Sequence, residues 1–366
     1  MRRLGEKVHQ TYDTPSAAGC QLDRATDLAT LRLVTASVVL FGRKPRPDAT
    51  SIEHVFNVVR PRLPARFDVR NVTTPFDNRG LVPRLRSIFW ARARQADVNH
   101  VVGDVNFLDL GLDPRRTVLT VHDCEFMERA GALKGFIYRW AWLRLPVRRA
   151  AIVTVPSIAT RDELIECSGA EPSKIRIVPN PVDPLFVPTD RAFDERKPVL
   201  LQVGARSNKN LERVARALEG TPCTLVVVGL MSDEQEALLR SLSIDFVDTG
   251  PLTATEIAER YRECDVVLFA STKEGFGLPI VEGQASGRVV VTSRLVPMSD
   301  VAGDGACLVD PFDVASIRGG IHRVISDVSY RRTLIDAGLR NVERFRPEAV
   351  AGMYASIYDE LLASRS

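Results

Sequence analysis

Several widespread functional motifs are missing from this 366-residue sequence. There is no P-loop, no G-x-S-x-G nucleophile motif, and no D-x-D pair of the kind that holds a divalent cation. The glycine fingerprint of dinucleotide-binding proteins is also missing, because the sixth position of the run that contains Gly275 and Gly277 is Ile280. A nicotinamide-dependent oxidoreductase is therefore disfavoured, and we expect no metal and no resident cofactor.

Paired cysteines and long apolar runs are absent as well. The six cysteines are scattered without a C-x-x-C pair, which argues against a zinc site or a disulfide framework and favours free thiols in a reducing cytosol. The first 30 residues are polar and lack the apolar stretch of a secretion signal. The longest apolar runs are far shorter than the ~20 residues that span a bilayer. These features predict a cytoplasmic protein.

Charge is small overall but unevenly distributed. The 49 basic and 46 acidic residues give a net charge of +3. Residues 1–192 carry 29 basic and 21 acidic side chains (+8), whereas residues 193–366 carry 20 and 25 (−5). A basic first half suggests an anionic partner. No zinc-finger spacing, RNA-binding signature or basic helix with heptads accompanies it, so we expect no nucleic acid but a phosphorylated small molecule or an anionic membrane surface.

Short β-branched segments recur along the chain and alternate with stretches of helical periodicity such as 210–218, 232–242 and 253–264. This pattern is typical of parallel sheets covered by helices on both faces. Two successive sets of six segments predict an α/β protein with two doubly wound domains, and they fit a single eight-stranded barrel poorly. The segments are 31–42, 66–72, 98–102, 117–121, 151–155, 175–178, 198–203, 224–228, 244–247, 266–269, 289–292 and 307–309.

A connector rich in proline and charge, 180–197, divides the two sets of segments. We therefore expect an N-terminal tail or extension (1–28), a first domain (29–190), a second domain (191–345) and a closing C-terminal segment (346–366). In that last segment, 348–362 has apolar residues at helical spacing and predicts a long helix with one buried face. The apolar residues are Val350, Met353, Tyr354, Ile357, Tyr358, Leu361 and Leu362.

The segment EGFGLPIVE, 274–282, has the strongest signal for chemistry. It follows a predicted strand, its glycines allow a tight turn, and Pro279 suits the first position of a helix. Glu274 should then lie in a loop at the strand's carboxyl end and Glu282 in the first helical turn. Ligands of such sheets bind at this edge, and N–H groups at a helix start favour a diphosphate. The alternative is a tight loop in which Glu282 only complements the helix dipole.

Two further loops follow predicted strands. In VGARSNKNL, 203–211, Gly204 allows a sharp turn that brings Arg206 and Lys209 to the mouth of the second sheet, where two cations can neutralise a leaving diphosphate. The alternative is a solvated basic loop. In TVHDCEF, 120–126, His122 ends a strand of the first domain and is either an active-site group or a structural histidine. His100 and Asp104 end another strand and could face the same cleft.

These segments, in this order, resemble the family 4 glycosyltransferases, which have the two-domain GT-B fold with both Rossmann-like domains facing a cleft. The resemblance includes the E-x7-E element, the turn with the two cations, the VPNPVD segment and the DVAGDGACLVDP tail. In the first domain, FGRKPRPDATSIEHVF, NHVVGDVNF and TVHD are similar to a bacterial, mannosyltransferase-like subgroup. The resemblance covers about residues 30–362.

The resemblance implies a retaining, metal-independent hexosyltransferase of polysaccharide biosynthesis that uses GDP-mannose or a UDP-hexose and a glycan or lipid-linked acceptor. Glu274 would hold sugar hydroxyls, Glu282 the ribose, Arg206 and Lys209 the diphosphate, and His122 would lie against the donor sugar. The remaining expected donor contacts are Gly204, Gly275, Phe276, Gly277 and Leu278. On the acceptor side we expect Arg43, Lys44, His100 and Asp104.

Other functions remain open on the sequence alone. A non-catalytic nucleotide-sugar-binding subunit, a sugar-nucleotide epimerase or a phosphorylase on the same fold would share much of this pattern. The segment 136–149, FIYRWAWLRLPVRR, combines two tryptophans with several arginines. It either lies on an anionic membrane, at the inner face of the plasma membrane where lipid-linked acceptors reside, or forms an amphipathic helix, ended before Pro146, that packs on its own domain.

Overall fold

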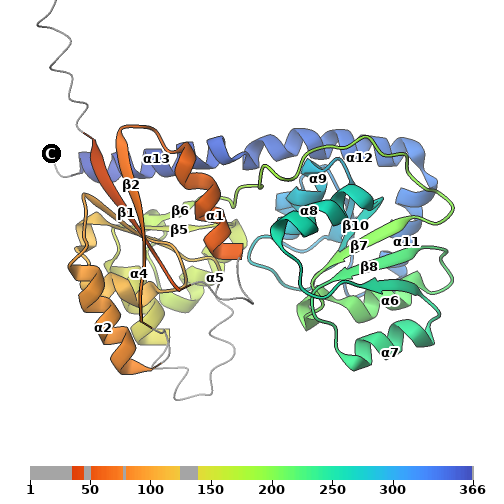
Figure 1. Cartoon of the computed structure of the whole chain (residues 1–366), viewed down its shortest axis with the longest axis horizontal. Helices are drawn as coiled ribbons and strands as arrows, with labels where there is room; N and C mark the ends of the chain where they lie inside the picture. Colours follow the sequence, from red (N-terminus) through yellow and green to blue (C-terminus); the bar gives the residue numbers. More distant parts are fainter. Residues whose placement is uncertain (1–34, 45–50, 77–79, 124–138, 365–366) are drawn as a thin grey trace, which may run out of the picture. The chain divides into compact units, whose positions relative to one another are not determined.

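The structure is a computed structural model that describes residues 35–44, 51–76, 80–123 and 139–364. The predicted N-terminal tail (1–28) and the first part of the 136–149 segment lie outside the described residues. Within them the chain forms two six-stranded sheets whose neighbouring strands are all parallel (Figure 1). Each of the twelve strand segments predicted from the sequence corresponds to one strand, although boundaries differ by a few residues.

The first sheet has the strand order β2-β1-β3-β4-β5-β6. Its strands are β1 (Ala36–Gly42), β2 (Phe67–Thr73), β3 (Val98–Val101), β4 (Thr117–Thr120), β5 (Ile152–Val155) and β6 (Ile175–Ile177). One face packs against α1 (Ser51–Val59) and α13 (Pro347–Ala363), which are labelled beside β1 and β2 in Figure 1. The other face packs against α2 (Leu81–Arg92), α4 (Leu145–Arg149) and α5 (Ile158–Ser168). The C-terminal helix thus completes the core of the first sheet.

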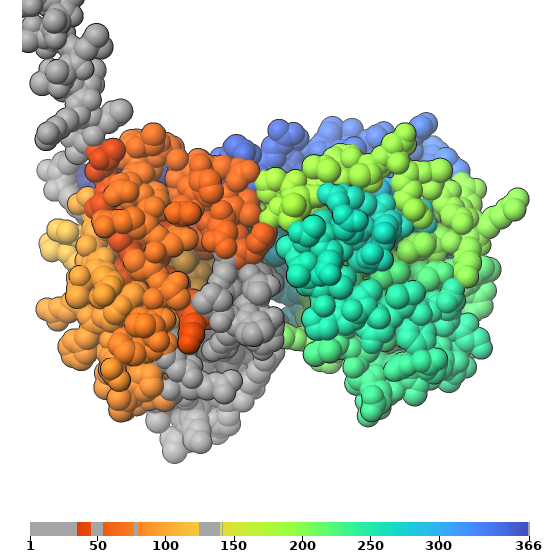
Figure 2. All heavy atoms as spheres, in the orientation of Figure 1, coloured from red at the N-terminus to blue at the C-terminus, as the bar shows by residue number. Residues whose placement is uncertain are grey.

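The second sheet has the strand order β12-β11-β10-β7-β8-β9. Its strands are β7 (Val199–Val203), β8 (Thr224–Val228), β9 (Asp245–Asp248), β10 (Val266–Phe269), β11 (Val289–Ser293) and β12 (Cys307–Val309). One face is covered by α6 (Leu211–Leu218), α7 (Asp233–Ser241), α11 (Val314–Ser326) and α12 (Val328–Asn341). The other is covered by α8 (Ala254–Glu263), α9 (Leu278–Ala285) and α10 (Met298–Ala302). In Figure 2, green and teal residues of α7 and α8 form much of the visible surface over this sheet.

The strand orders identify where each sheet can receive a ligand. In the first sheet the order reverses between β1 and β3, and in the second it reverses between β7 and β10. Loops that leave the carboxyl ends of such neighbouring strands diverge to opposite faces of the sheet, which leaves a crevice between them. The loops that contain Arg43 and Asp104 begin at the first reversal, and those that contain Lys209 and Glu274 begin at the second.

The helical predictions are largely confirmed, with two corrections. The closing helix buries most of the predicted face, but Met353 is 40% exposed and is not part of the core. In the 136–149 segment the chain stays helical through Pro146, which lies in the first turn of α4. There Leu143 and Val147 are buried in the core of the first sheet, as expected for a segment packed on its own domain. Among the described residues, no helix combines the length and the apolar character that crossing a bilayer requires.

One charged side chain is buried deep in the first half. Asp109 has no exposed surface, and neither carboxylate oxygen has a hydrogen-bond partner among the described residues. Its ion-pair partner is Arg149, whose Nε lies 3.5 Å from the Asp109 Oδ2. Burial raises the pKa of the Asp109 carboxyl to about 7, although Arg149 and Lys174 act in the opposite direction. The carboxylate therefore destabilises the fold when it is ionised.

Candidate active site

The loop after β7 and the loop after β10 are joined by hydrogen bonds at the strand-order reversal of the second sheet. The N–H of Thr272 donates to the carbonyl of Asn208 at 2.8 Å. The side-chain amide of Asn208 donates in return to the carbonyl of Lys273 at 3.0 Å. Asn210, only 1% exposed, donates its amide to the carbonyl of Ala270 at 2.9 Å. Two loops that lie about 60 residues apart in the sequence thus form one surface.

Lys209 and Glu274 meet on this surface. The Lys209 Nζ lies 2.6 Å from the Glu274 Oε1, and the two side chains are only 19% and 13% exposed. The ammonium also lies 4.7 Å from the centre of the Phe269 ring. Gly204 makes room for this arrangement: its φ is +90°, and a Cβ there would lie 3.1 Å from both Cγ and Cε of Lys209. Replacing Gly204 would therefore displace the lysine that holds Glu274.

Arg206 lies in the same loop but is exposed. It directly precedes the short 3-10 turn Ser207–Lys209. Among the described residues its side chain has no hydrogen-bond or ion-pair partner. The predicted pair of cations is thus present in one loop, with Lys209 held by a carboxylate and Arg206 directed to solvent.

The chain from Gly275 to Leu278 connects this surface to α9. Gly277 precedes the helix, Leu278 is its first residue and Pro279 its second, one position later than predicted. The N–H groups of 275–278 donate no hydrogen bond to any described residue. Such N–H groups at the start of a helix favour an anion or a hydroxyl-rich ligand. The Phe276 side chain points inward and packs edge-on against Phe345 at a ring distance of 5.7 Å.

Glu282 lies on α9 and is half-buried. It is the fifth residue of the helix, so the expectation that it lies in the first turn is wrong, and Glu282 begins the second turn. Burial raises the pKa of the Glu282 carboxyl to about 7, and the charge of Asp183 adds to this. The hydroxyl of Tyr261, which donates to the Glu282 Oε2 at 2.7 Å, and the charge of Lys209 act in the opposite direction. Glu282 and Lys209 are thus close enough to interact electrostatically.

His122 touches the Glu274–Gly277 turn through its backbone. It follows β4, is 8% exposed, and its Nε2 lies 3.2 Å from the carbonyl oxygen of Val102. A Cβ on Gly275 would come within 2.7 Å of the His122 carbonyl oxygen, so the two backbones are in direct contact. The structure therefore brings His122 beside the predicted donor residues.

The four residues expected on the acceptor side separate into different environments. Arg43 and Asp104 meet at the strand-order reversal of the first sheet, where the Arg43 Nη1 lies 2.9 Å from the Asp104 Oδ2. Lys44 is exposed beside them. His100 is fully buried, and its ring nitrogens lie 2.8 Å from the Tyr358 hydroxyl and 2.7 Å from the Thr120 hydroxyl.

The buried position of His100 does not fit the expectation that it faces an acceptor. Burial, together with the nearby His122, lowers its pKa to about 3, so the ring is neutral. It joins the first sheet to α13. The sequence places His100 near a strand end but does not show that its side chain points toward the closing helix rather than toward the sheet edge.

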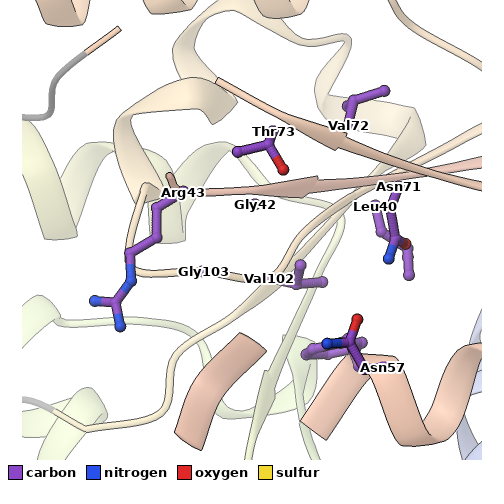
Figure 3. Close-up of a pocket in the computed structure, with 10 residues that line it drawn as sticks. Leu40, Gly42, Arg43, Asn57, Asn71, Val72, Thr73, Val102 and Gly103 are labelled. Atoms are coloured by element: carbon purple, nitrogen blue, oxygen red, sulfur yellow. The ribbon is translucent and has the colours of Figure 1, made fainter. Parts of the chain in front are cut away.

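A pocket of about 140 Å³ opens beside Arg43, at the carboxyl ends of β1, β2 and β3 (Figure 3). Its apolar lining includes Leu40, Phe56 and Val102. In Figure 3 the side-chain amides of Asn57 on α1 and Asn71 on β2 lie on facing sides of the pocket. Phe56 also packs edge-on against His122 at a ring distance of 6.3 Å. The pocket is therefore adjacent to the histidine that contacts the Glu274–Gly277 turn.

Several groups that shape this site were not singled out from the sequence. Asn208 and Asn210 hold the two loops together, and Tyr261 donates to Glu282. The sequence did contain a sign of the two asparagines, because they lie in the loop whose two cations were predicted to bind a diphosphate. For Tyr261 there was none, because it is 21 residues from its partner and lies on another helix. Among the described residues, no group of three or more His, Cys, Asp or Glu side chains is arranged to hold a metal ion.

Comparison with known proteins agrees with this architecture. Residues 32–185 match the family described as Glycosyltransferase Family 4, and residues 187–340 match the family described as Glycosyl transferases group 1. The chain is 29% identical over 232 residues to D-inositol 3-phosphate glycosyltransferase of Acidothermus cellulolyticus, covering 56% of this chain and 52% of the relative. It is 30% identical over 247 residues to MMP alpha-(1->4)-mannosyltransferase of Mycolicibacterium hassiacum, covering 63% and 60%.

The matches thus span only about half to three fifths of these relatives' lengths. The crystal structure of Anabaena Alr3699/HepE in complex with UDP-glucose superposes with a TM-score of 0.69 at 17% identity, covering 89% of this chain and 100% of that chain. At this level of identity the likeness concerns the fold. The two family matches follow one another along most of the chain, one on each sheet, and the protein belongs to the family 4 glycosyltransferases with the GT-B fold.

Proposed function

We propose that this protein transfers a hexose from a nucleoside-diphosphate sugar to a glycan or lipid-linked acceptor, with retention of the anomeric configuration and without a metal. The observation that carries the proposal is the contact between Lys209 and Glu274, beside the exposed Arg206, at the strand-order reversal of the second sheet. A carboxylate can accept hydrogen bonds from sugar hydroxyls, and two cations can bind a diphosphate. Together these groups suit a sugar that is activated by a nucleoside diphosphate.

The cations act on the charge that develops in the reaction. As the bond to the anomeric carbon breaks, negative charge grows on the departing diphosphate and positive charge on the sugar. An ammonium has three hydrogen-bond donors, so Lys209 retains two for phosphate oxygens while it donates one to Glu274. Arg206 adds a planar donor that suits phosphate. Cations that are in place before the reaction stabilise its transition state without reorganisation.

The two carboxylates bind different parts of the donor. Glu274 accepts hydrogen bonds from hydroxyls of the sugar, and Glu282 accepts them from the ribose diol. The N–H groups of 275–278 supply further donors to the sugar or phosphates. His122 lies against the sugar on the other side of the turn, where closure around the donor excludes water that would otherwise hydrolyse it.

The identity of the donor is proposed from the related proteins, and that of the acceptor from the pocket. A GDP-mannose or UDP-hexose donor is supported by the mannosyltransferase among the relatives and by the UDP-glucose complex among the structural neighbours. The acceptor is assigned to the pocket beside Arg43. Because Arg43 is paired with Asp104, and the pocket is lined by apolar side chains and by the amides of Asn57 and Asn71, it suits a neutral hydroxylated ring.

The proposal is tested by screening nucleoside-diphosphate sugars, including UDP-glucose and GDP-mannose, for thermal stabilisation and then for release of nucleoside diphosphate with sugar acceptors. Glu274→Ala should lose turnover but keep much of its affinity for the nucleoside diphosphate. Lys197→Ala is the matched control for Lys209→Ala, because Lys197 also pairs with a carboxylate, at 2.8 Å, but on the exposed surface. Turnover that both lysine variants retain equally would remove the diphosphate assignment.

A further inference from the structure

Two hydroxyl groups of the first half converge on one backbone carbonyl of the Glu274–Gly277 turn. The Oγ of Ser157 lies 2.8 Å from the carbonyl oxygen of Gly275, and the Oγ1 of Thr160 lies 2.9 Å from the same atom. Ser157 precedes α5 and Thr160 lies in its first turn. Both side chains are buried, with exposed fractions of 6% and 2%. The hydroxyls lie 118 and 115 residues from Gly275 in the sequence, so only the folded arrangement brings the three groups together.

Hydrogen bonds to this carbonyl fix the neighbouring N–H as well. The carbonyl of Gly275 and the N–H of Phe276 belong to the same planar trans peptide unit, so they point in opposite directions. Holding the oxygen toward α5 therefore directs the Phe276 N–H away from α5. That N–H donates to no described residue. Donors on the carbonyl oxygen also polarise the peptide, which strengthens its N–H as a donor.

Further contacts hold the same peptide against the first half. The backbone of Gly275 lies directly against the carbonyl of His122, since a Cβ at this glycine would come within 2.7 Å of the carbonyl oxygen. One residue before Glu274, the Nζ of Lys273 lies 3.2 Å from the Oε1 of Glu163 on α5. The turn is thus held by α5 on one side while Lys209 holds Glu274 on the other.

We propose that Ser157 and Thr160 are positioning residues for sugar transfer, which orient the Gly275–Phe276 peptide so that its N–H donates to the bound donor. This inference rests on the proposed function, because it assumes that a nucleoside-diphosphate sugar occupies the turn. It adds a requirement that the donor residues alone do not include: the N–H becomes oriented only when α5 of the first half contacts the turn of the second.

The test is Thr160→Val, which removes one hydroxyl and keeps the side-chain shape, with Thr160→Ser as the variant that keeps the hydroxyl. Wild type and variants are compared for kcat and KM with UDP-glucose or GDP-mannose, whichever the wild type consumes, and for Kd of the corresponding nucleoside diphosphate. Thr160→Val should lower kcat/KM about 3- to 10-fold, the range for one lost hydrogen bond. The Kd should stay within about twofold, because the nucleotide is held by the second half, and Thr160→Ser should restore turnover.

Ser157→Ala provides a second variant, and its unfolding midpoint is measured alongside because Ser157 also caps α5 by accepting the Thr160 N–H at 3.0 Å. Turnover of Thr160→Val within about twofold of wild type would overturn the inference and leave the proposed function intact. A fall in turnover matched by an equal loss of nucleotide affinity and a lower unfolding midpoint would also overturn it, because it would indicate a structural role. A wild type that consumes no nucleotide sugar would instead remove the proposed function itself.

Discussion

The pH dependence of donor binding tests the role of Glu282. Burial raises the pKa of its carboxyl to about 7. A ribose diol donates hydrogen bonds, and it donates them to the carboxylate much better than to the protonated acid. Donor binding should therefore favour the ionised form, and the protein should release a proton when it binds a donor below about pH 7. The affinity falls as the pH falls, because a growing fraction of the free protein has a protonated Glu282.

The magnitude follows from the position of this pKa. A group with a pKa of about 7 is roughly 90% ionised at pH 8 and roughly 10% ionised at pH 6. The affinity for UDP-glucose or GDP-mannose should then drop about tenfold between these pH values. Sugar nucleotides suit the measurement because their diphosphate, esterified at both ends, does not titrate in this range. Isothermal titration calorimetry at pH 6, 7 and 8 measures both the affinity and, in buffers of different ionisation heat, the proton release.

Glu282→Gln removes the titrating group and nearly preserves the shape of the side chain. Its donor affinity should be weaker than that of the wild type at pH 8 and nearly constant between pH 6 and 8. Glu259→Gln is the matched control, since Glu259 is exposed on the neighbouring helix α8 and should leave the pH profile unchanged. If Glu282→Gln kept the full pH dependence, another group would be responsible and the ribose assignment would lose its support.

Three other predictions follow from named contacts. Arg206→Ala and Lys209→Ala should each lower kcat/KM by ~10²–10³, the scale for losing one transition-state contact, and steady-state kinetics that show near-normal turnover in both would contradict their role. The folded-state pKa of Asp109 is about 7 against an ordinary value of 3.8, so the buried carboxyl lowers stability as the pH rises through this range. Asp109→Asn should therefore raise the free energy of unfolding by ~2–4 kcal/mol at pH 8 and change it little at pH 4, as denaturant titrations at both pH values would measure. Gly275→Ala should abolish turnover because its Cβ would come within 2.7 Å of a backbone oxygen, whereas Gly319→Ala, which meets no atom within 4 Å, should behave as wild type in the same assay.

The fold could be predicted closely because the central strands of both sheets are buried on both faces. In the sequence, such strands are continuous runs rich in β-branched residues. The runs 117–121, 224–228 and 266–269 are examples, and they match β4, β8 and β10. The strand order could not be derived from these runs, since the central strands have the same kind of composition. It depends on which helix crosses which face, and that is decided by packing between segments far apart in the sequence. The return of α13 to the first sheet is the clearest case.

Site residues could be predicted where a single loop combines glycines with charged side chains. They could not be predicted where the role of a residue depends on contacts with distant segments. Glycine, charge and position after a strand identify the loops of Lys209 and Glu274, and the structure places their charged groups 2.6 Å apart. The same reasoning selected His100, whose side chain points into the core. It left out Thr160, because a hydroxyl in a helix's first turn usually serves the helix. Only the three-dimensional contact shows that this hydroxyl also reaches the other half of the chain.

The charge asymmetry of the chain indicates little about where its charged ligand binds. The first half is the basic one, yet the two cations assigned to the diphosphate, Arg206 and Lys209, belong to the half with net negative charge. Several arginines of the first half are instead stacked on aromatic rings of that half, as Arg84, Arg86 and Arg94 are at 4.5, 4.6 and 4.7 Å. A net charge sums side chains over a whole surface, whereas a phosphate responds to the few charges that lie within a Debye length of it. The strand-order reversals are the better guide, because they determine which loops can meet a ligand at all.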